Sequence, residues 1–209
     1  GPSLFETADE YERLVSNPPG NKELNKKKKV ARDTALGALR LSQVKRGEDA
    51  TLSMAGVSFR HLAMLAQIKS NDRDIWDSLK RSRHLEGEPN EVLINRLSRM
   101  RHWIDSKHFP EDARIKIQES ISEENRRKIS NKQSNFLSLL FSRLEKIDWN
   151  ENEINENIRS VSSDIELNRR DAYVALYILI LGSEYGPRIA SIMNEIGKKS
   201  TLDIFSKSL

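Results

Sequence analysis

Cysteine is absent from the 209-residue sequence, and several kinds of site are excluded with it. Without thiols the chain has no disulfide, no zinc site built from thiolates and no cysteine nucleophile. Glycine and proline are also scarce, at nine and six residues. Because these two residues are the main interrupters of helices, their scarcity permits long regular segments.

Long apolar runs are missing as well. The longest, residues 174–181, is far shorter than the roughly 20 residues that a membrane-spanning helix needs. No secretory signal pattern opens the chain. We therefore expect a cytoplasmic protein without a membrane partner. Residues 1–3, Gly-Pro-Ser, resemble the scar of a cleaved tag, so we expect this chain to be a fragment of a longer protein.

Recognisable catalytic motifs are not found. The sequence contains no glycine-rich phosphate loop, no nucleophile elbow and no metalloprotease helix signature. The four histidines (His61, His84, His102 and His108) are too scattered to form a spaced metal site. We therefore expect no catalytic residue, no metal and no cofactor in this chain, and we expect the isolated chain to be non-catalytic.

Charge is abundant but nearly balanced. Lysine and arginine number 35 and the acidic residues 31, which leaves a net charge of +4. If the excess gathers on one face, it favours a nucleic-acid partner; if the signs are mixed, it concerns solubility alone. Residues 22–46 are strongly basic, and the lysine run at residues 26–29 is typical of a solvated loop.

Helical periodicity extends over almost the whole chain and predicts an all-α fold, a bundle of two packed helical subdomains with no sheet. The expected helices include residues 5–15, residues 57–68, a helix capped by Asp72, a helix starting at Pro89, and a helix opened by Ser122 that continues to Ile147. A break at residues 110–121 predicts the boundary between subdomains 4–115 and 116–209.

Residues 169–181 are strongly apolar, and periodicity alone fits a buried strand as well as a buried helix. We interpret them as a helix because nothing else in the chain offers a sheet. Gly182 is a suitable residue for its C-terminal cap.

A basic and aromatic cluster lies on the clearest amphipathic helix, whose apolar stripe is Leu93, Leu97, Met100 and Ile104. The cluster contains Arg96, Arg99, Arg101, His102, Trp103 and His108. Single-stranded RNA is read by stacking bases on aromatic rings or guanidinium planes, so this mixture predicts an RNA-binding surface. In the alternative, Trp103 is a core residue and the arginines pair with acids.

A second candidate site is the turn Gly186-Pro187-Arg188. A helix starting at Pro187 would present unpaired N–H groups and the positive end of its dipole beside Arg188, which stabilises phosphate. A tight turn between helices needs the same glycine and proline, so both interpretations stay open.

Several stretches together resemble the C-terminal part of class I lysyl-tRNA synthetases. The most specific is Leu-Gly-Ser-Glu-Tyr-Gly-Pro-Arg at residues 181–188, at the end of an apolar helix. The others are Asp-Glu-Tyr-Glu-Arg-Leu at 9–14, Phe-Arg-His-Leu at 59–62, Arg-His-Trp-Ile at 101–104 and Pro-Glu-Asp at 110–112. Their order along the chain is the order in that family.

The resemblance implies a helix-cage subdomain followed by an anticodon-binding helical domain. It implies a lysine-specific tRNA as partner, with Arg188 and Lys198 among the contacts. It also implies that the ATP-dependent ligase chemistry resides in an upstream Rossmann-type domain. Two alternatives remain from the residues alone: a helical protein-interaction module, and a related fold that binds another RNA.

Overall fold

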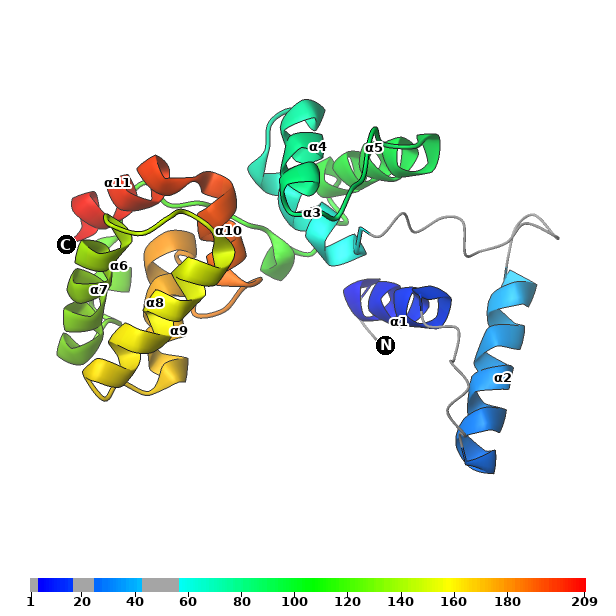
Figure 1. Ribbon diagram of the computed structural model, residues 1–209, viewed down its shortest axis with the longest axis horizontal. Coiled ribbons are helices and arrows are strands. Elements are labelled where there is room, and N and C mark those ends of the chain that lie inside the picture. The colour runs from blue at the N-terminus through cyan, green and yellow to red at the C-terminus, as the bar shows by residue number, and fades with distance from the viewer. Residues whose placement is uncertain (1–3, 17–24, 43–56) are drawn as a thin grey trace. The chain divides into compact units, whose positions relative to one another are not determined.

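The computed structural model describes residues 4–16, 25–42 and 57–209 (Figure 1). Within these ranges every regular element is a helix and there is no strand, which confirms the all-α prediction. No helix in the described ranges has the length and apolar character that would carry it across a membrane. The predicted tag scar at residues 1–3 lies outside the described residues.

The chain divides into two compact units, Gly1–Lys107 and His108–Leu209. The predicted boundary, between residues 115 and 116, lies further along the chain. The segment in between belongs to the second unit. Within it, Phe109 is 4% exposed and Arg114 lies over its ring, and just after it the Gln118 N–H donates to the Ile180 carbonyl at 2.9 Å.

The first unit contains five described helices. They are α1 (Leu4–Ser16), α2 (Lys26–Ser42), α3 (Phe59–Ile68), α4 (Asp72–Arg81) and α5 (Glu91–Asp105). Leu62, Leu65, Ile75, Leu79 and Leu93 form the centre of the core that α3, α4 and α5 share, each at most 1% exposed. The lysine run predicted as a loop is instead the first turn of α2.

Two predicted helix starts in this unit are wrong by one or two residues. Asn71, not Asp72, caps α4, since its side chain accepts from the Asp74 N–H at 2.9 Å. Asn90 caps α5 in the same way, with a 2.8 Å bond from the Leu93 N–H, so Pro89 precedes the helix. An amide at the N-cap satisfies one of the backbone donors that the first turn leaves unpaired.

The second unit is a bundle built around α9. Its elements are the short 3₁₀ helix η2 (Glu111–Ala113), α6 (Glu123–Arg126), α7 (Asn131–Leu144), α8 (Glu151–Asp164), α9 (Arg169–Leu181), α10 (Ile189–Ile196) and α11 (Lys198–Ser208). The predicted single helix from Ser122 to Ile147 is two helices. Ser130 and Gln133 form a reciprocal capping box that starts α7 afresh.

The apolar segment is the helix that the sequence predicts. Ala172, Ala175 and Leu176 on α9 are completely buried, and α7, α8, α10 and α11 all pack against this helix. Gly182 ends it with a left-handed φ of 68°, which a residue without Cβ adopts at little cost. The position of α9 matters for function, because Arg169, Tyr173 and Tyr177 lie along a part of its surface that the other helices leave partly uncovered.

Candidate nucleic-acid interface

Arg101, one of the predicted RNA contacts, is tied into the first unit. Its Nε lies 2.8 Å from an Asp72 carboxylate oxygen. Its terminal nitrogens donate to the carbonyls of Ala66 and Lys69, each at 3.3 Å. These carbonyls are at the C-terminal end of α3, where a helix lacks internal partners for its last acceptors. The guanidinium therefore caps α3 and joins it to α4 and α5.

Arg96 and Trp103 also have partners within this unit. Arg96 donates to the Val57 carbonyl at 3.3 Å and lies 3.8 Å from the Glu12 carboxylate. The Trp103 ring is half-buried, with its centroid 5.6 Å from Phe5 and 5.8 Å from Phe59. Aromatic pairs at these distances stabilise packing. This arrangement agrees with the alternative in which Trp103 belongs to the core.

Arg99 and His102 lie on the solvent side of α5 and are exposed. His108, the first residue of the second unit, is exposed as well. Of the basic residues predicted on this helix, Arg99 and His102 are therefore the ones best placed to meet a partner.

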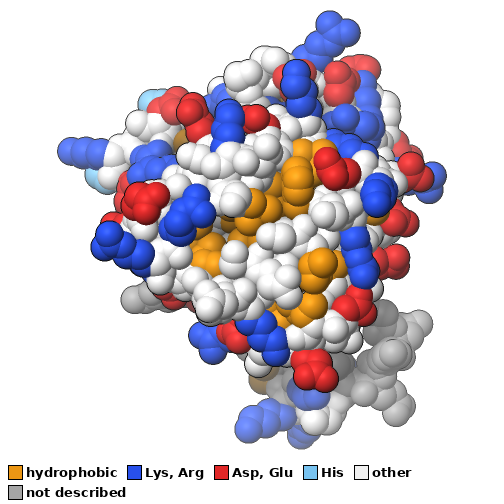
Figure 2. Space-filling view, turned by 90° about the vertical axis from the view of Figure 1, so that its left-hand side faces the viewer, with side chains coloured by type: hydrophobic (Ala, Val, Ile, Leu, Met, Phe, Trp, Pro, Cys, Tyr) orange, Lys and Arg blue, Asp and Glu red, His pale blue; other side chains and the backbone are white. Residues whose placement is uncertain are grey.

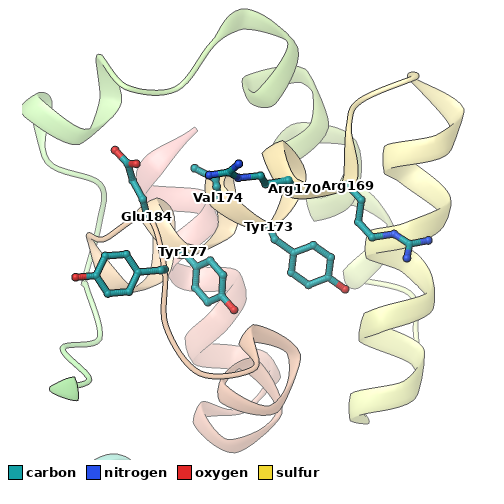
Figure 3. Close-up of a pocket in the computed structure, with 7 residues that line it drawn as sticks. Arg169, Arg170, Tyr173, Val174, Tyr177 and Glu184 are labelled. Atoms are coloured by element: carbon teal, nitrogen blue, oxygen red, sulfur yellow. The ribbon is translucent and has the colours of Figure 1, made fainter. Parts of the chain in front are cut away.

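A groove on the second unit was not predicted from the sequence (Figure 3). It encloses about 560 Å³. Its lining consists of Arg169, Arg170, Tyr173, Val174, Tyr177, Glu184 and Tyr185. The first five come from α9 and the last two from the loop that follows it. Residues 169, 173 and 177 are spaced by four, so they form one stripe along the helix.

The two tyrosines on α9 have polar neighbours at their hydroxyl groups. The Tyr173 hydroxyl donates to the Asn155 side chain at 3.3 Å. The Tyr177 hydroxyl lies toward the Ile189 N–H in the first turn of α10. Burial raises the pKa of Tyr177, and nearby Tyr173 adds to this, while the Ile189 N–H opposes it. Both rings are half-buried and keep one part of their surface toward the groove.

The loop after α9 is shaped by a close approach at Gly186. A Cβ there would lie 2.7 Å from a terminal methyl of Leu181 and 3.4 Å from the Tyr177 ring. The loop therefore lies directly on the end of α9, which brings Glu184 and Tyr185 to the groove. Tyr185 is 64% exposed, so most of its ring meets solvent.

The two predicted contacts nearest the C-terminus differ in their surroundings. Arg188 is exposed and stands before the first residue of α10, where its side chain makes no cap hydrogen bond. Lys198 is half-buried and donates to the Ile147 carbonyl at 3.0 Å, which links α11 to the connection between α7 and α8. Lys198 thus has a structural partner, and Arg188 faces solvent.

Charge on one side of the molecule is of mixed sign. Figure 2 shows the side that carries α6, α7 and α11 in Figure 1, where basic and acidic side chains are interspersed around a band of apolar atoms. Among the described residues, no group of acidic and histidine side chains is arranged to hold a metal ion. Within the groove, Arg169 lies at one end and Glu184 at the other, and the Arg170 side chain lies between them (Figure 3).

Comparison with known families decides the class of this fold. The profile of the family described as "Anticodon binding domain" matches residues 77–205, well over half of the chain and parts of both units. The chain belongs to the anticodon binding domain family. The groove on α9 lies entirely within the matched span.

Relatives of this anticodon binding domain support the resemblance seen in the motifs. A lysine–tRNA ligase of Picrophilus torridus is 24% identical over 209 residues, covering 100% of this chain and 38% of the relative. Lysine–tRNA ligases of Methanopyrus kandleri and Archaeoglobus fulgidus are each 28% identical over 68% of this chain, and the matches cover 27% and 28% of those relatives. The chain therefore spans well under half the length of these relatives. The predicted family resemblance is confirmed.

Proposed function

We propose that this chain is the tRNA-binding region of a lysine–tRNA ligase and that it recognises the anticodon stem and loop of lysine tRNA. The main support is the anticodon binding domain match over residues 77–205, combined with relatives named as lysine–tRNA ligases. In this proposal, ATP-dependent attachment of lysine belongs to the part of the ligase that the relatives have beyond the matched span. That part is the proposed upstream Rossmann-type domain.

Binding the tRNA at a site remote from the reacting atoms serves to orient it. Contacts to the anticodon end fix the orientation of the whole tRNA, so that the entropic cost of placing the acceptor end is met before the chemical step. The chain needs no catalytic residue to do this. It needs a rigid surface with phosphate and base contacts.

The exposed basic residues are the proposed contacts among those predicted from the sequence. Arg99 and His102 on α5, His108, and Arg188 before α10 all face solvent. We propose that they bind RNA backbone, whereas Arg96, Arg101, Trp103 and Lys198 act on binding through the fold that they hold together. Phosphate contacts of this kind set the position of the RNA and do not read its sequence.

A titration at two salt concentrations tests the proposal. It compares a lysine tRNA transcript with the same transcript carrying a changed anticodon. We expect a preference of at least about tenfold for the unchanged anticodon, equivalent to about 1.4 kcal/mol, and weaker binding of both at higher salt. Equal affinity for the two transcripts would contradict anticodon recognition.

A further inference from the structure

The groove along α9 combines features that suit one kind of ligand. We propose that it binds an unstacked nucleotide of a single-stranded RNA loop, with the base against Tyr173 and Tyr177 and the adjoining phosphates at Arg169 and Arg170. This inference rests on the proposed function, since it names the place on the second unit at which the anticodon loop is held.

The tyrosines offer a prepared stacking surface. Their positions on α9 differ by four residues, so the rings are neighbours one turn apart, about 6 Å along the axis. Each ring is half-buried against the bundle, and the Tyr173 hydroxyl donates to the Asn155 side chain at 3.3 Å. Because the rings are already ordered, a base that stacks on them does not have to order the protein first.

Two arginines at the start of α9 supply the positive charge. Arg169 and Arg170 are exposed, and within the described part of the chain neither guanidinium forms an ion pair closer than 4 Å. They occupy the first turn of the helix, where the macrodipole disfavours cations. Placing two cations there is unfavourable for the helix by itself, but it is favourable once anions such as the phosphates of an RNA backbone are bound beside them.

Glu184 sets the direction in which the nucleotide lies. In Figure 3 it is at the opposite end of the groove from Arg169, with Tyr173 and Tyr177 between them. A carboxylate repels phosphate but accepts hydrogen bonds from the amino or imino groups on the edge of a base. The backbone of the RNA therefore runs by the arginines, and the base edge points toward Glu184.

The apolar residues of the groove favour a nucleotide over a simple anion such as inorganic phosphate. Val174 and the faces of three tyrosines form much of the lining. Inorganic phosphate would use only the arginines, whereas a nucleotide uses the rings and the guanidinium groups together.

The test uses the full chain and an RNA hairpin that carries the anticodon stem and loop of lysine tRNA. In a set of matched hairpins, each loop nucleotide in turn loses its base and keeps its phosphate. For the unchanged protein, we expect removal of one particular base to weaken binding by about tenfold, as loss of one stacked base does.

Tyrosine variants then locate that base. Tyr173→Leu with Tyr177→Leu keeps apolar volume but removes both rings, and this protein is expected to bind the intact and the abasic hairpin equally. Tyr173→Phe with Tyr177→Phe keeps the rings and is expected to retain the tenfold difference. Circular dichroism and the melting temperature of each variant show that it is folded before it is titrated.

The arginines are tested by the salt dependence of binding. Arg169→Gln and Arg170→Gln should each reduce the slope of log affinity against log salt by about 0.7, the value for one phosphate contact on a single strand. Lys146→Gln is the matched control, because it also removes one exposed positive charge. Lys146 lies before α8 and does not line the groove. The control slope should equal that of the unchanged protein.

The outcomes separate the two proposals. If the unchanged protein binds the hairpin but the leucine variants keep the full response to base removal, the groove is not the base site, and the proposed function stands. If the unchanged protein shows no preference for lysine tRNA in the transcript titration, the proposed function fails, and this inference fails with it. A retained response in the phenylalanine variant and a lost one in the leucine variant establish the stacking site.

Discussion

Replacing Arg101 by methionine should destabilise the first unit, because the guanidinium caps the end of α3. Methionine keeps the aliphatic stem of the side chain and removes the charged group that bonds Asp72, Ala66 and Lys69. The matched control is Arg99→Met on the same helix. Arg99 is exposed, so its replacement removes the same charge without exposing a helix end.

The size of the effect follows from the contacts. Asp72 is 54% exposed, so its ion pair contributes at most about 1 kcal/mol. The carbonyl bonds are long, at 3.3 Å, and each contributes roughly 0.5 kcal/mol, the low end for a net hydrogen bond. The ion pair and the three bonds sum to at most about 2.5 kcal/mol, which lowers the melting temperature of a unit of this size by up to roughly 10–20 °C.

Tryptophan fluorescence can report on this unit alone. The chain has three tryptophans, and Trp149 is the one in the second unit, so Trp149→Phe leaves Trp76 and Trp103 as probes of the first. In that background we expect Arg101→Met to melt well below the parent and Arg99→Met to melt close to it. Equal melting temperatures for the two variants would show that the capping contacts of Arg101 do not stabilise the unit.

Two further changes test packing and ionisation. Burial raises the pKa of Glu12 above its usual value, so the folded state holds that proton more tightly, and stability falls as pH rises through the raised pKa. Glu12→Gln should remove this pH dependence. In thermal melts from about pH 4 to 7, the parent should lose stability relative to the variant as the pH rises. A difference in stability that stays constant with pH would refute the raised pKa of Glu12. Gly186→Ala places a Cβ 2.7 Å from Leu181 and should cost about 1 kcal/mol in urea unfolding, the low end for overpacking because a terminal methyl can turn aside. Gly37→Ala in α2 is its control, with no atom within 4 Å of the added Cβ, and equal losses from the two changes would argue against a steric origin.

The helices could be predicted from the sequence, whereas several of their starts could not. Apolar periodicity identifies a helix because one face must be buried, and this holds for α5. The helix α9 was predicted on another ground, since its periodicity fits a strand as well and nothing else in the chain offered a sheet. The choice between adjacent cap residues depends on one backbone dihedral, which is why Asn71 was missed in favour of Asp72. In the same way, the apolar pattern continues past Ser130, and only the capping box shows that a new helix begins there.

The residues of the candidate site could not be predicted for a different reason, which is that their contacts are distant in the sequence. Arg99 and Arg101 are equivalent in the sequence, but Arg101 reaches carbonyls at positions 66 and 69, which local pattern cannot reveal. Tyr173 and Tyr177 were overlooked because they stand in an apolar run that predicts a buried helix. Their spacing of four residues, in line with Arg169, is the signal that marks an uncovered face on that helix.

One hydrogen bond in the second unit joins positions far apart in the chain. The Ile121 N–H donates to the Ser208 hydroxyl at 2.9 Å, in a buried position one residue from Leu209. The segment that leads into α6 therefore meets the end of α11, so a short linker could connect Ile121 to the last residues and new ends could be opened between α7 and α8. A circularly permuted bundle of this kind would keep the α9 groove intact while moving both termini away from the buried Ile121–Ser208 contact.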